Sequence, residues 1–520
     1  MKKLSILSLA LVLCFTSCDN YLDVNENKNK ATSVSPELVF PQALAATGFA
    51  LNSYNTYGAQ LVGYQANAGG YGGFNENVSY AFTPNNYNTG TTSLWNMTYD
   101  NLEDYQYIIN ATEGVDANVY YNAAAKIMRV YDFQMLVDTY NNIPYTNALK
   151  GAENLTPAYD DAATIYASLA TELDGAMSII NTGLAAAIAP TSIAAYDIIF
   201  KGDMTKWLKL ANTIKLRLMV RGNGKATFSN ASFDAAGFLT TDALINPGYL
   251  RDNNRQNPKW NTWGFAYTGS AGNKAWIPST FVLGFYNGAK LKDNGRGAKM
   301  YYQFPSTGTN QLGYESTGIP KSPDGSFWYP GTNRDGKVAG GSTGALKGPS
   351  MGMPMLTAAE SYFLQAEAAL NGMISGDPKA LFNAGITASF TYLYTDESGT
   401  VTGNPAADAT AYIAANNSNY LANFDQATSN AQKLEAIITQ KYVAMNMVNG
   451  QEGWNEYRRT GYPTVSGTAA GSTFASTVSQ SSRADRLPSR ILYPTSEIQY
   501  NPENVPTGIS PFTSNIFWAK

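Results

Sequence analysis

Apolar residues recur at intervals of three and four positions in five stretches of the chain, the spacing that lines one face of an α-helix. These stretches are residues 124–136, 165–180, 207–218, 362–370 and 434–445. The fourth follows Thr357 and Glu360, a T-x-x-E pair typical of a capping box at a helix N-terminus. The pattern therefore predicts helices in the first and last thirds of the chain that pack side by side as pairs.

Two long segments between these helices lack helical periodicity. Residues 63–95 and 247–353 are dense in Gly, Asn, Pro and aromatic residues. Loops longer than ~15 residues in a compact protein are usually functional or disordered, and the aromatic content argues against disorder. We therefore predict long loops with short strands in both segments, and a further exposed loop at 397–410.

The helical stretches do not follow a strict repeat of the tetratricopeptide kind, which has a period near 34 residues. Small residues at packing positions, such as Ala124, Ala211 and Ala366, are compatible with degenerate helix-pair units. Because no linker divides the chain, we expect a single large domain.

The N-terminus carries the pattern of an export signal. Lys2 and Lys3 precede an apolar run at 4–15, which is shorter than the ~20 residues needed to cross a bilayer. Thr16 and Ser17 stand directly before Cys18, and this arrangement resembles the lipobox of bacterial lipoproteins, in which the cysteine is lipidated. We therefore predict a lipoprotein signal peptide at 1–17, a mature domain at 18–520 and lipidation of Cys18. The alternative is an ordinary signal peptide that leaves this cysteine as a free thiol.

The scarcity of two residue types excludes several kinds of site. The chain has no histidine, and its only cysteines are Cys14 and Cys18. Histidine-dependent nucleophile arrangements and the usual histidine or cysteine metal sites are therefore absent, and we predict no cofactor and no metal. Without the two lysines of the signal, 33 basic residues face 39 acidic ones, a net acidity that argues against a nucleic-acid partner.

The overall composition favours a neutral ligand. Charged residues make up 14% of the chain, below the ~25% of an average soluble domain, while tyrosine occurs 35 times and asparagine and glycine are frequent. Aromatic rings present flat apolar faces and asparagine offers both donor and acceptor, which suits hydroxyl-rich molecules. Exported proteins often have this composition, so it identifies no particular ligand.

Six segments together resemble one family of proteins. They are NYLDVNENKNKATSVSPELVFPQAL (20–44), YDFQMLVDTYNNIPYTNAL (131–149), GDMTKWLKLANTIKLRLMVR (202–221), LTAAESYFLQAEAAL (356–370), QKYVAMNMVNGQEGWNEYRRTGYP (440–463) and RLPSRILYPTSEIQYNPENV (486–505). In this order and over nearly the whole mature chain they resemble the SusD/RagB-like family of surface lipoproteins from Gram-negative bacteria. The closest likeness is to the SusD-like branch with RRTGYP near the C-terminus.

The resemblance implies a fold and a role. The fold would be mainly α, with tetratricopeptide-like helix pairs as a scaffold and a loop-rich part with short strands that carries the ligand site. The protein would be lipid-anchored to the outer membrane at the cell surface. There it would cap a SusC-like TonB-dependent transporter and deliver glycans, or peptides in some members, without catalysis. One departure is the stretch at 291–304, which reads Asp293-Asn294-Gly295-Arg296 where the family has D-P-R.

The residues of the recurrent motifs are expected to be structural. Trp454 and Arg458 are four positions apart and so share a helix face, where the arginine can stack on the indole or pair with Glu452 or Glu456. The same interpretation applies to Trp207, Arg217, Arg221 and the Tyr493-Pro494 pair.

A ligand platform should instead lie where the helical periodicity fails, since loops on a rigid scaffold can vary freely. The candidate aromatic residues are Tyr71, Phe74, Tyr80, Trp95, Trp260, Trp263, Trp276, Trp328 and Tyr329. The candidate polar partners are Asn75, Asn77, Asn273, Asp324, Asn333 and Arg334. For each aromatic residue the alternative is a core position beneath a long loop.

Four functions are compatible with these patterns. Glycan capture for a transporter is favoured by the lipobox, the aromatic loops and the family resemblance. The alternatives are a peptide-binding lid of the same transporter type and a non-catalytic protein scaffold. A glycoside hydrolase fits least, because it would need two carboxylates ~5–10 Å apart and no spacing among acids such as Glu103, Asp104, Asp160 and Asp161 isolates a pair.

Overall fold

The computed structural model describes residues 34–332 and 342–520, and these are mainly helical. The helices are α2 (Pro36–Leu61), α3 (Glu76–Ser79), α4 (Leu94–Thr112), α5 (Val119–Tyr140), α6 (Ala162–Ala185), α7 (Met204–Arg221), α8 (Pro258–Trp263), α9 (Thr280–Leu283), α10 (Asn294–Met300), α11 (Ala358–Leu370), α12 (Pro378–Tyr394), α13 (Pro405–Ala415), α14 (Asn430–Met445), α15 (Gly450–Thr460) and α16 (Thr495–Tyr500). The strands are β1 (Gln65–Asn67), β2 (Ala243–Ile245), β3 (Trp276–Pro278) and β4 (Met353–Leu356). The fold class is the one expected from the sequence.

The strands form two small antiparallel sheets of two strands each. In one, Gln65 of β1 lies opposite Pro278 of β3, and in the other, Ala243 of β2 lies opposite Leu356 of β4. Each pair joins segments more than a hundred positions apart, so these strands fasten loops to the helical scaffold.

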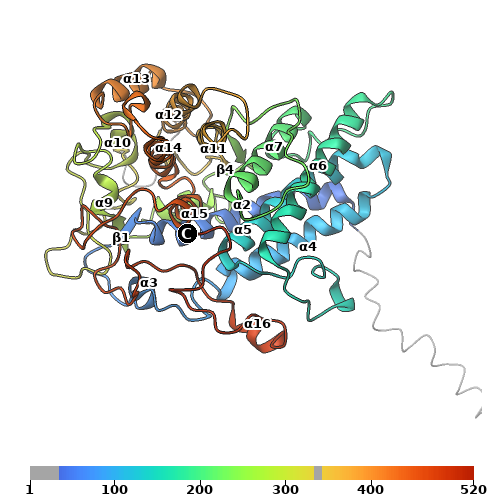
Figure 1. Cartoon of the computed structure of the whole chain (residues 1–520), viewed down its shortest axis with the longest axis horizontal. Coiled ribbons are helices and arrows are strands. Elements are labelled where there is room, and N and C mark those ends of the chain that lie inside the picture. The colour runs from blue at the N-terminus through green and yellow to red at the C-terminus, as the bar shows by residue number, and fades with distance from the viewer. Residues whose placement is uncertain (1–33, 333–341) are drawn as a thin grey trace, which may run out of the picture.

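The helices form two groups (Figure 1). Helices α4 to α7 lie side by side at the right of the view, and α11, α12 and α14 lie together at the upper centre. All five predicted helices are confirmed, within α5, α6, α7, α11 and α14. The predicted capping box is half formed: the hydroxyl of Thr357 accepts the N–H of Glu360 at 3.3 Å, but the Glu360 carboxylate pairs with Arg217 instead.

The predicted loops contain more helix than expected. Helix α4 already begins at residue 94, α8 lies inside 247–353, and α13 begins at residue 405 inside the loop predicted at 397–410. These helices start at local caps: the side chain of Asn257 accepts two N–H groups at the start of α8, and Asn404 caps α13 ahead of a proline. Helix α8 has only six residues, too few to show a helical period, whereas α4 has 19 residues and was missed for another reason.

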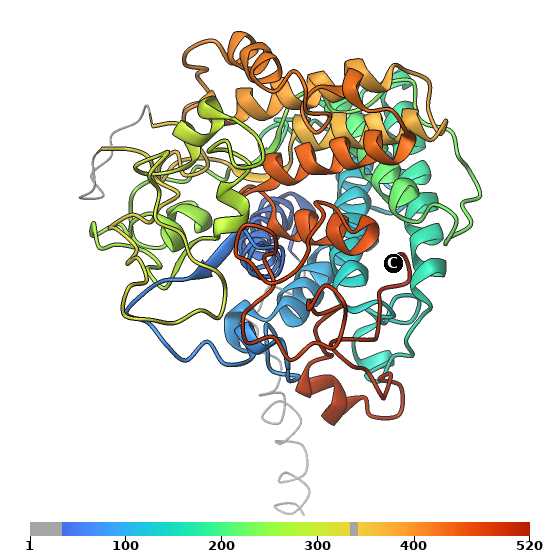
Figure 2. The same ribbon diagram turned by 60° about the vertical axis from the view of Figure 1, so that its left-hand side comes forward.

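Helix α2 runs through the centre of the molecule, where Figure 2 shows it nearly end-on, with other elements on all sides. One side packs on α4, where Tyr54 donates a hydrogen bond to the carbonyl of Leu94. On the other side it crosses α15 so closely that a Cβ on Gly58 would lie 2.2 Å from the backbone of Gly450. This crossing joins the start of the described chain to its last third.

A buried ionic cluster ties five helices together. Its members are Asp138, Arg217, Arg221, Glu360, Lys441, Glu452 and Glu456. Arg221 lies 2.5 Å from the Asp138 carboxylate and 2.6 Å from that of Glu452. Burial opposes the charge of Glu452, but Arg221 and its cationic neighbours hold the pKa of that carboxyl below its usual range. The motif residues on α7 and α15 are therefore structural, as expected from the sequence.

Arg458 makes one of its two expected interactions. Its guanidinium lies 5.3 Å from the ring of Trp454, which is the stacked arrangement, and it also covers Trp518. It donates hydrogen bonds to the carbonyls of Asp138 and Ser489 rather than pairing with the glutamates of its own helix. Those glutamates form ion pairs with the cations of the ionic cluster instead.

Asp132 on α5 is a buried acid, and no cation is paired with it among the described residues. The side chains of Asn101 and Thr47 donate to its carboxylate, at 2.8 Å from Asn101. Burial raises the pKa of Asp132 to about 7, although these hydrogen bonds partly offset the effect. Around pH 5 the folded protein therefore holds a proton that the unfolded chain has released, so the protein loses stability as the pH rises from about 4 to about 7.

The variant Asp132→Asn should remove this pH dependence. At pH 8 the variant should have a higher free energy of unfolding than the native protein. We expect this difference to be smaller by about 2–3 kcal/mol at pH 5, because the carboxyl of the native protein is neutral at that pH. Urea denaturation of both proteins at the two pH values measures the difference. A difference that stays constant would show that Asp132 does not titrate in this range.

Candidate functional site

Most of the predicted ligand-binding aromatic residues lie in the hydrophobic interior. The buried ones are Phe74, Tyr80, Trp95, Trp260, Trp263, Trp276, Trp328 and Tyr329. Several pack on one another: the rings of Trp263 and Trp328 lie 5.5 Å apart edge to face, and those of Phe74 and Trp276 lie 5.1 Å apart. All eight therefore occupy the core position that the sequence analysis gave as the alternative to ligand contact.

Tyr71 is the exception, with 46% of its surface exposed. It stands in the run Gly-Gly-Tyr-Gly-Gly at 69–73, where Gly70 and Gly73 have positive φ values of 85° and 77°. The segment is fastened at its start, because the N–H of Gly69 donates to the carbonyl of Pro320 at 2.9 Å. Tyr71 is thus presented to solvent on an anchored turn.

A second exposed tyrosine, Tyr314, lies on the segment that holds this turn and was not singled out from the sequence. It is 52% exposed, and its carbonyl accepts the side-chain amides of Asn67 and Asn310. The side-chain oxygen of Asn67 in turn accepts the N–H of Gly313 at 2.8 Å. These hydrogen bonds join the two segments, and we refer to Tyr71 and Tyr314 together as the two-tyrosine face. A tyrosine beside glycine in a loop was the available signal for both.

The polar candidates have different environments. Asn75 is exposed at a positive φ of 39°, and Asn77 is partly buried in α3. The side chain of Asn273 accepts the N–H of Ala275, which makes it a turn residue, and Asp324 forms an exposed ion pair with Lys274 at 2.7 Å. The remaining predictions, Asn333, Arg334 and the lipidation of Cys18, lie outside the described residues.

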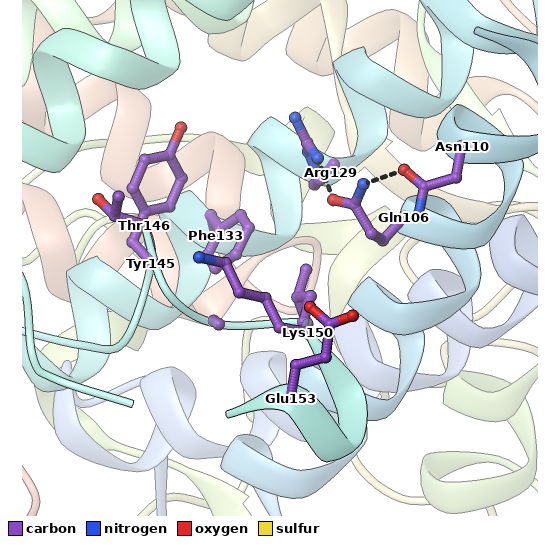
Figure 3. Close-up of a pocket in the computed structure, with 10 residues that line it drawn as sticks. Gln106, Asn110, Arg129, Phe133, Tyr145, Thr146, Lys150 and Glu153 are labelled. Atoms are coloured by element: carbon purple, nitrogen blue, oxygen red, sulfur yellow. Dashed lines mark hydrogen bonds between the residues drawn. The ribbon is translucent and has the colours of Figure 1, made fainter. Parts of the chain in front are cut away.

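A separate polar cleft of about 630 Å³ opens between α4, α5 and the segment 145–153 (Figure 3). It is lined by Gln106, Asn110, Arg129, Phe133, Tyr145, Thr146, Ala148, Leu149, Lys150 and Glu153. Nothing in the local sequence pattern brings these residues together. They are joined by the antiparallel packing of α4 on α5 and by the turn that follows α5.

The wall of the polar cleft is held by a chain of hydrogen bonds that crosses three helices, α4, α5 and α6. Arg129 on α5 donates through Nε and Nη2 to one carboxylate oxygen of Glu172 on α6, at 2.9 and 2.6 Å. Its Nη1 donates to Gln106 on α4, whose amide donates to Asn110 at 2.7 Å. Burial raises the pKa of the Glu172 carboxyl, and Arg129 opposes that rise. The guanidinium is therefore fixed from both sides.

Two of the acids considered for hydrolysis, Asp160 and Asp161, have structural contacts. Asp160 accepts the N–H groups of Tyr145 and Thr146 at 2.9 and 2.8 Å, so it holds the turn that borders the cleft. Asp161 caps α6 by accepting the N–H of Thr164. Among the residues that the structure describes, no group of three or more His, Cys, Asp or Glu side chains is arranged to hold a metal ion.

Comparisons with known proteins show a family and a fold. The SusD-like family model, described as "Starch-binding associating with outer membrane", matches residues 28–494. A solved SusD homologue from Bacteroides fragilis is 21% identical with a TM-score of 0.65, covering 94% of this chain and 100% of that one. A chitin-binding SusD homologue from Flavobacterium johnsoniae is 21% identical with a TM-score of 0.63, covering 92% and 99%. A comparison with curated protein sequences finds no match.

Proposed function

The chain belongs to the SusD-like family, and from this premise we propose that it captures glycans at the outer membrane and delivers them to a SusC-like TonB-dependent transporter. The observation that carries the proposal is the family match over residues 28–494, whose description names both starch binding and the outer membrane. The chitin-binding relative of the same fold supports a glycan as the ligand class.

The proposal includes the attachment to the membrane. Residues 1–17 would be removed as a signal peptide, and the single domain at 18–520 would be anchored by lipid on Cys18. In the described parts of the chain, no helix has the length and apolar character needed to cross a bilayer. Mass spectrometry of the mature N-terminus tests the anchor, since an unmodified first residue would contradict it.

The protein would act by binding alone. Each tyrosine of the two-tyrosine face can stack on a sugar ring, a contact of about 1 kcal/mol, and a few hydrogen bonds from neighbours such as Asn75 would add to it. A total of about 4–8 kcal/mol corresponds to millimolar to micromolar affinity. Such weak capture suits delivery, because the cargo must be released to the transporter.

The double variant Tyr71→Ala/Tyr314→Ala should weaken glycan binding at this face by about 2 kcal/mol, roughly thirty-fold in Kd, because two stacking contacts are lost. A glycan array with a parallel peptide panel first identifies the ligand, and isothermal titration calorimetry then compares the proteins. Tyr500→Ala on α16 is the matched control, since this tyrosine is 75% exposed. Binding of peptides but no glycan would replace the proposal with the peptide-binding alternative.

A further inference from the structure

We propose that the polar cleft between α4, α5 and the segment 145–153 is a second glycan-binding site, which takes a short neutral oligosaccharide. It lies among the paired helices, whereas Tyr71 follows β1 in the chain and the carbonyl of Tyr314 accepts the side-chain amide of Asn67 in that strand. The inference rests on the proposed glycan-capture function. The volume of the polar cleft, about 630 Å³, is within the usual range of small-molecule sites.

The first argument is that the cleft holds its hydrogen-bond donors ready before any ligand arrives. Arg129 has five N–H donors, and contacts with Glu172 and Gln106 use three of them. In the described part of the chain the other two have no protein acceptor. Because the guanidinium is already immobilised, a ligand that binds these donors loses little side-chain entropy. A planar guanidinium with two remaining N–H groups suits a pair of neighbouring sugar hydroxyls.

The second argument concerns charge. The cation of Arg129 is balanced by Glu172, at 2.6 Å, and the exposed side chains of Lys150 and Glu153 at the mouth have opposite signs. The cleft therefore has no net charge with which to select an ion. Its other polar lining groups are the amides of Gln106 and Asn110 and two hydroxyls, which both donate and accept hydrogen bonds. This set matches a neutral, hydroxyl-rich ligand.

The third argument is that an aromatic ring and a strained turn border the same space. Tyr145 is partly exposed, and its ring lies 4.8 Å from that of Phe133 at 78°, which holds it upright at the edge of the cleft (Figure 3). Leu149 lines the cleft with a φ of 59°, a left-handed conformation that a leucine rarely adopts. Strain of this kind gathers at ligand sites, where the surrounding structure maintains it.

The test fills the cleft without breaking the chain of hydrogen bonds. Ala148 lines the cleft and is partly exposed, so Ala148→Trp should block the space while Arg129, Gln106 and Glu172 keep their contacts. Ala148→Ser is the matched control. Titration calorimetry with maltoheptaose and with chitohexaose should give two sites per chain in the native protein. We expect Ala148→Trp to retain only one, and the two-tyrosine double variant to retain the cleft site. Thermal unfolding confirms that each variant is folded.

The outcomes separate this inference from the proposed function. Oligosaccharide binding could be unchanged in Ala148→Trp and lost in the two-tyrosine variant. That result would overturn the cleft assignment but leave the proposed glycan capture intact. Absence of binding to either oligosaccharide would overturn the cleft assignment and count against the proposed function as well. A second variant, Asn110→Ala, removes only the exposed end of the hydrogen-bond chain and should weaken the cleft site about three- to tenfold.

Discussion

Replacing Arg221 by methionine is expected to lower the free energy of unfolding by about 3–5 kcal/mol, because it leaves buried carboxylates without their cation. Arg221 contacts Asp138, Glu452 and Glu456 at 2.5, 2.6 and 3.3 Å. Methionine fills much of the same volume, so the loss would report charge rather than a cavity. Chemical denaturation by urea, followed by circular dichroism, measures the change.

The control for this variant is Arg255→Met. Arg255 is exposed and lies 3.8 Å from Asp252, and exposed ion pairs contribute about 0–1 kcal/mol. If both variants lose the same small amount, the ionic cluster does not stabilise the fold. The Arg221 variant should also respond to pH in a particular direction. Lowering the pH protonates the orphaned carboxyls and should restore part of the lost stability.

Gly58→Ala is expected to cost at least about 3 kcal/mol, an overpacking effect at the upper end of the usual range. The added methyl group would lie 2.2 Å from backbone atoms of Gly450 and Gln451, and backbone at a helix crossing cannot move aside as a side chain can. The helices α2 and α15 would have to separate. Thermal denaturation, together with the yield of folded protein, measures the effect.

Gly175→Ala is the matched control, since Gly175 also lies inside a helix, α6, but its Cβ would meet no atom within 4 Å. There the substitution should stabilise the protein by about 0.5–1 kcal/mol, because alanine favours helix over glycine. Equal effects of the two variants would mean that the close approach of α2 and α15 does not limit the packing.

The sequence predicted five helices correctly, but it did not predict the long helices α2, α4 and α12, and it predicted the loop-rich part poorly. Helix α6 buries Ile165, Leu169 and Leu173 at helical intervals, so a local pattern shows it. The burial of Trp263 and Trp328 depends instead on segments far apart in the chain meeting in space. An aromatic residue in a glycine-rich loop can stack on a ligand or on its neighbour, and composition alone does not separate the two.

The residues of the candidate sites were also difficult to predict from the sequence. Tyr71 was one of nine aromatic candidates in the sequence, and only the structure separates it, as exposed, from the eight that are buried. The polar cleft was invisible in the sequence because Gln106, Arg129 and Lys150 lie on three different elements. The family resemblance identified the scaffold, and its motif residues proved to hold that scaffold together.

The crossing of α2 and α15 also sets the order in which the protein can complete its fold. The N–H of Gly450 donates to the side chain of Asn55, a contact between residues 395 positions apart. During synthesis the apolar helix α2 emerges long before the partner that covers it, and contacts of such high sequence separation form slowly. The newly made chain therefore passes through a stage with an uncovered central helix, during which it needs protection from aggregation.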